Sequence, residues 1–157
     1  MSQAAQVIEA LGDNAGDSIH NEALTAAASA VKPGHLVEEL AAGTVQEHST
    51  AATNAQKLVA LTNLCNGKTI DDAYGVAETC RYGAFRAGQL AFLRVAASAP
   101  AIVIGDALES AGDGTVRKQV TDSATDDTQR NALVGHAVEA VDNSGGGTEV
   151  FIKIRFA

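Results

Sequence analysis

The length of 157 residues is that of a single domain. The chain carries 19 acidic and 11 basic residues, for a formal net charge of −8, which argues against a surface built to neutralise nucleic-acid phosphates. Hydrophobic residues make up 46% of the chain but aromatic residues only 4%, so large core side chains are few and we expect stability to be gained from an oligomer or a larger assembly.

The N-terminal part of the chain differs from the rest. Residues 1–30 are expected to form an arm or added strands, and residues 31–157 a separate β-rich domain. The arm contains no Lys or Arg and so lacks the basic region of a signal peptide, which predicts a soluble protein made in a cytoplasm. Asp17 or Ser18 could cap an Ala-rich helix, but we favour extended structure there.

Small polar residues and glycines punctuate the remaining chain about every ten residues, a spacing typical of short strands. The clearest strand is the last, where alternate positions from Val150 to Phe156 are apolar. The segment "FRAGQL" is interpreted as a turn. The expected strands are 57–61, 79–85, 89–95, 116–120, 133–141 and 150–156.

A short pattern recurs along the chain. "GHLVE" at 34–38, "GDALE" at 105–109 and "GHAVE" at 135–139 share a glycine, a polar residue, two small or apolar residues and a glutamate. In the first two, "GTV" begins nine residues after that glycine, at Gly43 and Gly114. The repetition favours a small β-barrel or sandwich built from similar hairpins, with chance similarity in an Ala- and Gly-rich chain as the alternative.

The stretch from Gly105 to Lys118 is rich in glycine and acidic residues. Its acidic spacing does not match an EF-hand loop, whereas Asp-Gly before a strand-like segment predicts a hairpin turn. The predicted structural turn residues are Gly34, Gly105, Asp113, Gly114 and Gly135.

No catalytic, metal-binding or cofactor-binding residue is predicted, and we expect no enzymatic activity. "NGKT" at 66–69 lacks the upstream glycine of a phosphate-binding loop, and the four histidines form no known metal motif. Cys65 and Cys80 are expected to be reduced, buried thiols. The apolar region 90–104 is interrupted by Arg94 and is too short to span a bilayer, so no membrane partner is expected.

One stretch resembles an enzyme motif. "GKTIDDAYGVAE" is similar to a segment of trimeric dUTPases, in which an Asp helps to activate water and a Tyr stacks on the sugar. Ile70, Asp71 and Tyr74 match it. The first glycine is displaced by one residue, and the family's Arg-Ser-Ser and glycine-rich phosphate motifs are missing, so the triphosphate has no clamp.

A broader resemblance covers the chain from about Lys32 to its end. The segments "KPGHLVE", "GKTIDDAY", "RYGAFRAGQLAFL", "GDALESAGDGTVRK" and "VGHAVEAVDNSGGGTEVFIKIRF", in this order, resemble the capsid decoration (cement, or head-stabilising) proteins of tailed bacteriophages. The resemblance implies a mainly β, barrel-like or β-tulip domain of short antiparallel strands. It also implies a homotrimer at threefold or quasi-threefold sites on the outer capsid surface of the virion, bound to the major capsid protein.

The shell-binding element is expected to be the N-terminal arm. Val7, Ile8 and Leu11 are apolar residues among polar neighbours and could add as a strand to an edge of the capsid protein. An adhesion or carbohydrate-binding module is the non-enzymatic alternative. Such a module presents exposed aromatic side chains to its sugar, and this chain has only two Tyr and four Phe.

Overall fold

The computed structural model describes residues 19–26, 30–62, 67–120 and 131–157, and these form ten strands. The strands are β1 (Ile19–Thr25), β2 (Leu36–Glu39), β3 (Thr44–Glu47), β4 (Leu58–Ala60), β5 (Thr79–Ala84), β6 (Leu90–Val95), β7 (Ala107–Ser110), β8 (Val116–Lys118), β9 (Leu133–Ala137) and β10 (Val150–Phe156). Each expected strand begins within one residue of an observed one. The favoured extended structure near the N-terminus is confirmed by β1.

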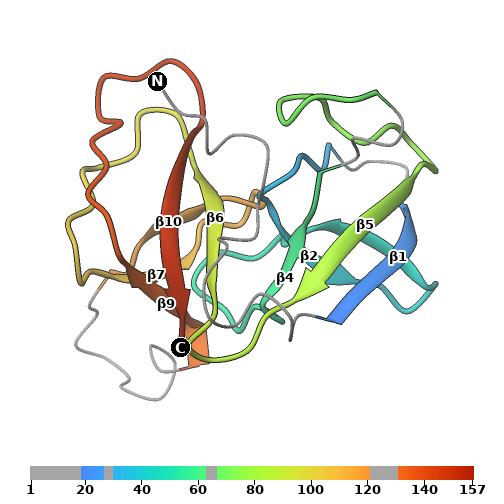
Figure 1. Cartoon of the computed structure of the whole chain (residues 1–157), viewed down its shortest axis with the longest axis horizontal. Coiled ribbons are helices and arrows are strands. Elements are labelled where there is room, and N and C mark those ends of the chain that lie inside the picture. The colour runs from blue at the N-terminus through green and yellow to red at the C-terminus, as the bar shows by residue number, and fades with distance from the viewer. Residues whose placement is uncertain (1–18, 27–29, 63–66, 121–130) are drawn as a thin grey trace.

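The strands close into two barrels of five strands each, which lie side by side (Figure 1). The first barrel has the order β1-β3-β2-β4-β5, and the second has β6-β8-β7-β9-β10. The predicted fold class, a mainly β structure with a small barrel of short strands, is therefore confirmed, with the difference that the chain forms two barrels. β1, which comes from the expected arm or added strands of residues 1–30, pairs with β3 and β5 of the expected domain 31–157.

Most neighbouring strands are antiparallel, as expected, but each barrel contains one parallel pair. These pairs are β1 with β3 and β6 with β8. The reason is geometric: strand directions cannot alternate all the way around a closed ring with an odd number of strands. A barrel of five strands must therefore contain at least one parallel contact.

The two barrels are copies of one topology, and their registers match in detail. The last residues of β1 and β6, Thr25 and Val95, pair with Val45 and Val116. Those two valines end the two "GTV" segments noted in the sequence. The recurring pattern thus corresponds to the β2–β3 hairpin in the first barrel and the β7–β8 hairpin in the second.

The polar positions of the repeated pattern have the same structural role in both barrels. His35 Nδ1 accepts a hydrogen bond from the Lys32 N–H (3.3 Å), and Asp106 Oδ2 accepts one from the Val103 N–H (2.9 Å). Each side chain therefore fixes the turn that leads into its hairpin. Gly34 and Gly105 lie in these turns with φ of +87° and +90°, a conformation that favours glycine.

The glutamate that ends the repeated pattern also has the same role in both barrels. Glu38 accepts a hydrogen bond from Gln46 on the next strand (2.7 Å), and Glu109 pairs in the same way with Arg117 (2.8 Å). Beyond the second glutamate, Asp113 and Gly114 lie between the antiparallel strands β7 and β8, so the predicted hairpin is observed. Gly114 has a φ of +78°.

Gly135 is a correction to the sequence interpretation. It was expected at a turn, but it lies within β9 and pairs with Leu108 on one side and Phe156 on the other. A Cβ at this position would lie 2.3 Å from the Arg155 carbonyl oxygen, so glycine is required by the close approach of β9 and β10. "GHAVE" is therefore a chance similarity to the hairpin pattern.

The two cores explain why β2 and β4 are buried on both faces. Val37, Leu58 and Ala60 point into the first barrel, where they pack in one cluster with Val31, Val45, Tyr74, Cys80 and Tyr82. The alternate residues of the same strands join a second cluster that fills the other barrel and the contact between them. Across this contact the rings of Phe85 and Phe156 stack, with centroids 4.9 Å apart.

Candidate functional site

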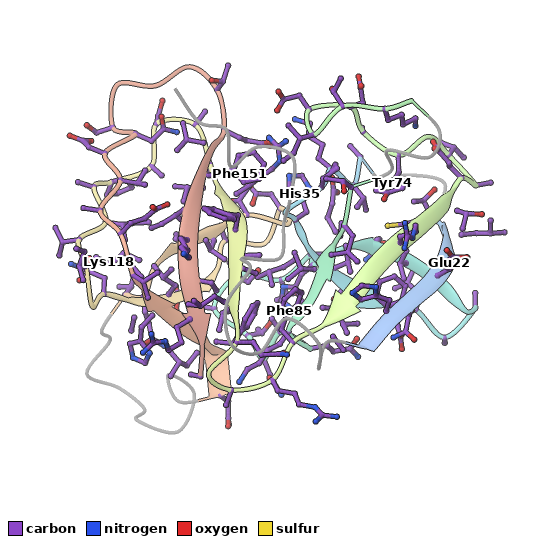
Figure 2. All side chains as sticks on the ribbon, in the orientation of Figure 1. Glu22, His35, Tyr74, Phe85, Lys118 and Phe151 are labelled. Atoms are coloured by element: carbon purple, nitrogen blue, oxygen red, sulfur yellow. The ribbon has the colours of Figure 1, made fainter. Side chains whose placement is uncertain are left out.

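The contact between the barrels gathers the main buried polar groups of the described chain. His35 and His48 come from the first barrel, and Arg94 and Ser110 from the second; all four are buried. Figure 2 shows His35 and Phe151 close together between the two barrels. Backbone hydrogen bonds reinforce the contact, because the Arg94 N–H donates to the Gly34 carbonyl oxygen (3.0 Å) across it.

Arg94 lies at the centre of this cluster, on β6, with only 3% of its side chain exposed. Its guanidinium group donates to the carbonyl oxygens of Pro33 (2.7 Å) and Ile70 (2.6 Å), both from the first barrel. It also pairs with Asp71 and Glu149, at 3.0 Å each, and lies over the Phe151 ring, 4.5 Å from its centroid. A buried guanidinium group with this set of acceptors fixes the second barrel to two separate segments of the first.

Glu149 carries the negative charge that faces Arg94. Glu149 Oε2, which faces Arg94, also lies 3.1 Å from Lys32 Nζ, and Glu149 Oε1 lies 3.5 Å from His35 Nε2. His35 Nδ1 accepts the Lys32 N–H, so the assigned tautomer has its proton on Nε2, facing the carboxylate. The imidazole of His35 and the ammonium group of Lys32 lower the pKa of Glu149 to about 2.

This depressed pKa predicts an acid-sensitive contact. Because the folded-state pKa of Glu149 lies below its ordinary value of 4.5, the stabilisation it gives is complete above that pH and is lost as the pH falls towards 2. We expect Glu149→Gln to lower the free energy of unfolding by on the order of 3 kcal/mol near neutral pH, with the difference from wild type shrinking towards zero at pH 2. Denaturant unfolding at a series of pH values measures this.

The control for that experiment is Glu22→Gln. Glu22 forms an exposed ion pair with Arg81, so its replacement should change stability little at any pH. A wild-type advantage over Glu149→Gln that stayed constant down to pH 2 would contradict the electrostatic role of Glu149.

A second buried polar contact joins the barrels at His48. Its Nδ1 lies 2.8 Å from Ser110 Oγ, and its Nε2 lies 4.0 Å from Glu38 Oε2. These residue types also occur in hydrolase triads, but Ser110 is completely buried and its Oγ accepts the Gly112 N–H (3.2 Å). No substrate carbonyl can reach this oxygen in the observed structure, and the contact is structural.

Of the residues in the dUTPase-like motif, Tyr74 is buried, whereas the Asp71 side chain is 79% exposed. The Tyr74 hydroxyl donates to the Leu61 carbonyl oxygen (2.6 Å), and its ring is 2% exposed, so it cannot stack on a nucleotide sugar. Asp71, also part of the dUTPase-like motif, pairs with Arg94. All Tyr and Phe residues lie in the described ranges, and each is buried or partly buried, whereas sugar-binding modules usually present exposed aromatic side chains.

Several other expectations concern single residues or small groups. Cys80 is buried, and burial raises the pKa of its thiol to about 12; Cys65 lies outside the described residues. Within the described ranges no group of three or more His, Cys, Asp or Glu side chains could hold a metal ion. In that same part of the chain, no helix has the length and apolar character that a membrane crossing would require.

The predicted capsid-contact residues Val7, Ile8 and Leu11 lie outside the described residues. The sequence interpretation missed two of the residues that join the barrels, Arg94 and Glu149. Arg94 was noted only as an interruption of an apolar region, and Glu149 only within the segment "VGHAVEAVDNSGGGTEVFIKIRF". A lone arginine between Leu93 and Val95 was the available signal, because a charge in a buried strand requires partners.

No protein-family model matches the chain, and no curated protein matches it. One solved structure with a similar fold is the crystal structure of the N base of head fiber gp8.5 from bacteriophage phi29. The two chains are 15% identical and superimpose with a TM-score of 0.52, covering 88% of this chain and 95% of that chain. A match of this extent includes both barrels, so the two-barrel arrangement is shared.

Proposed function

We propose that the chain is a structural protein of a bacteriophage virion that binds the outer surface of the icosahedral capsid as a homotrimer and stabilises the expanded shell. The observation that carries the proposal is the fold shared with the base of a phage head fiber, over nearly the whole of both chains. The order of motifs that resembles capsid decoration proteins supports the same role. The partners proposed are the major capsid protein and further copies of this chain.

The properties of the described residues agree with a binding role rather than a chemical one. Arg94, His48 and Ser110 are buried between the barrels, where their polar contacts hold the two barrels together. The net charge of −8 disfavours contact with the packaged DNA, which is consistent with a position outside the shell. A protein that binds the expanded lattice and not its precursor stabilises the expanded state by mass action.

The N-terminal arm is the proposed anchor. Ordering an arm costs about 1–2 kcal/mol per residue in backbone entropy, so a single arm would bind weakly. Three arms on one homotrimer act at a high effective concentration, which raises the overall affinity by roughly 10²–10⁴. The apolar residues Val7, Ile8 and Leu11 would supply the side-chain contacts of an added strand.

The proposal is tested by co-sedimentation with expanded, undecorated capsids of the phage that encodes the chain. We expect saturable binding at an integer multiple of the threefold sites and no binding to unexpanded procapsids. A chain lacking residues 2–15 should lose occupancy. A full-length chain with Val7, Ile8 and Leu11 all changed to Asp should lose it as well, because it keeps the arm's length but not its apolar face.

Absence of binding to both capsid forms would overturn the proposal. Unchanged occupancy of the shortened chain would exclude the arm as the anchor and move the search to the barrels. A wild-type chain that binds expanded capsids and procapsids equally would retain a capsid-binding role but contradict stabilisation of the expanded shell.

A further inference from the structure

At the buried polar cluster around Arg94 and His48, the two barrels contact each other through different surfaces, although they have the same topology. The first barrel contributes the turn before β2, around Gly34, and the segment after β3, around His48; we call this the turn surface. The second barrel contributes the end of β6 at Arg94, the hairpin glycine Gly114, and the loop before β10 with Glu149; we call this the strand surface. The contact is therefore head-to-tail.

Each barrel also carries the other surface, and the contact within the chain leaves it uncovered. In the second barrel the turn surface corresponds to the turn at Val103–Asp106 and the segment that follows β8. Asp106 pairs with Lys118 (2.9 Å), and the Gln119 N–H donates to the Ala107 carbonyl oxygen (2.8 Å). These bonds place Val120 beside the turn, as the segment at His48 lies beside the turn at Gly34.

In the first barrel the strand surface corresponds to the end of β1, the hairpin glycine Gly43 and the last part of the loop before β5, around Val76. The earlier part of that loop, at Ile70 and Asp71, contacts Arg94. Leu24 is the second-last residue of β1, as Arg94 is of β6. Leu24 pairs with Thr79 in β5, and Arg94 pairs with Phe151 in the equivalent strand β10, so the two residues have equivalent positions. The Thr25 hydroxyl donates to the Gly75 carbonyl oxygen (2.5 Å). The loop that carries Val76 is therefore held against the end of β1.

The large hydrophobic side chains that are exposed in the described residues all lie on these two uncovered surfaces. Their exposed fractions are 49–69%. Leu24 and Val76 lie on the strand surface of the first barrel, and Val103, Ile104 and Val120 on the turn surface of the second. Large exposed hydrophobic side chains on both unmatched surfaces, and on no other surface whose side chains the structure describes, indicate that each is covered in the functional state.

The glycines of the repeat give an independent comparison. A Cβ on Gly34 would lie 2.6 Å from the Phe151 ring, and one on Gly114 would lie 2.9 Å from the His35 ring, because the other barrel is packed against each position. Their equivalents Gly105 and Gly43 have positive φ as well, but a Cβ on either would meet nothing within 4 Å. The backbone at both uncovered surfaces therefore has the conformation that it has at the contact within the chain, but no barrel packs against it.

We propose that a second copy of this chain covers these surfaces. The turn surface of one copy, with Val103, Ile104 and Val120, packs on the strand surface of the next, with Leu24 and Val76, and repeats between chains the contact that each chain makes internally. Such a heterologous contact joins copies head to tail and either closes into a ring or grows as a filament. The proposed function includes association of this chain with further copies of itself, and the inference rests on that part of it. The inference adds the surfaces through which the copies bind.

The test is the mass of the protein in solution, by light scattering coupled to size exclusion. The wild-type chain should have an integer multiple of the 16.0 kDa chain mass, three chains for the homotrimer. Ile104→Asp and Leu24→Asp should each weaken association by roughly tenfold or more and shift the mass towards one chain. Val120→Asp and Val76→Asp repeat the test on each surface. Ala87→Asp, an exposed position in the turn between β5 and β6, adds the same charge elsewhere and should keep the wild-type mass.

A mixture of the Ile104→Asp and Leu24→Asp chains distinguishes a head-to-tail contact from a symmetric one. The first retains an intact strand surface and the second an intact turn surface, so the mixture should form a species of two chains, one of each kind. Far-UV circular dichroism of each variant verifies folding. A wild-type mass of one chain, variants that keep the wild-type mass, or a mixture that stays at one chain overturns the proposal.

Capsid co-sedimentation separates this inference from the proposed function. A wild-type protein that associates through these surfaces but binds no capsid overturns only the capsid role. An Ile104→Asp chain that has the wild-type mass and still binds capsids overturns only the assignment of the surfaces.

Discussion

Replacing Arg94 by Met is expected to lower the free energy of unfolding by roughly 3–5 kcal/mol. Methionine keeps much of the apolar stem over Phe151 but removes the donors to Pro33, Ile70 and Glu149. The two carbonyl groups and the carboxylate would then lie at the contact without their charged partner, and the loss of a partner is costly where water has little access. Denaturant unfolding of the wild-type and variant chains measures the difference.

Arg81→Met is the matched control, because Arg81 is also an arginine on a strand, in β5. It pairs with Glu22 at 3.5 Å, and both side chains are substantially exposed, so the expected loss is within about 1 kcal/mol. Equal losses for the two variants would show that the polar cluster between the barrels contributes no more than a surface ion pair.

Gly34→Ala is the second substitution with a large expected effect. The positive φ of +87° costs an alanine about 1–2 kcal/mol, and the new methyl group would also lie 2.6 Å from the Phe151 ring and 3.3 Å from the Arg94 side chain. Relief of that overlap requires the barrels to move apart, which adds about 1–3 kcal/mol. We expect the free energy of unfolding to fall by roughly 2–5 kcal/mol in total.

Gly88→Ala isolates the backbone part of this effect. Gly88 has a φ of +90°, and a Cβ there would meet nothing within 4 Å, so only the cost of the positive φ applies. The stability lost by Gly34→Ala should exceed that lost by Gly88→Ala. Equal losses would mean that the close approach of the two barrels at Gly34 is not required for stability.

The internal repeat links these predictions to the assembly. Arg94 and Leu24 have the same position in their barrels, but the first is buried under a neighbouring barrel and the second is exposed. The buried position holds a charged group with several acceptors, and the exposed one holds an apolar side chain. The proposed contact between copies would therefore be more hydrophobic than the contact within the chain, although both use the same backbone geometry.

Local patterns were sufficient to predict much of the secondary structure. Alternating apolar residues identified β10 with both of its bounds, and Asp113-Gly114 identified the β7–β8 hairpin. The similarity between "GHLVE" and "GDALE" indicated that similar hairpins recur. These features were accessible because strand alternation, turn residues and positive φ depend on a few neighbouring residues.

The pairing of distant segments could not be predicted in the same way. "GHAVE" has the repeated pattern, yet Gly135 lies in the middle of β9, because its role depends on the approach of the β10 backbone and not on its neighbours in sequence. The cluster at Arg94 likewise draws its partners from residues 33, 70, 71 and 149, and no local spacing relates these positions.

The sequence by itself determined that this protein is built from short strands and repeated hairpins, because those features follow from local backbone preferences and side-chain periodicity. Only the tertiary structure decided that the strands close into two barrels, which surfaces join them and which apolar residues stay exposed. The physical reason is that barrel closure and burial depend on contacts between residues far apart in the chain, and their free energy is gained only when the whole fold is assembled.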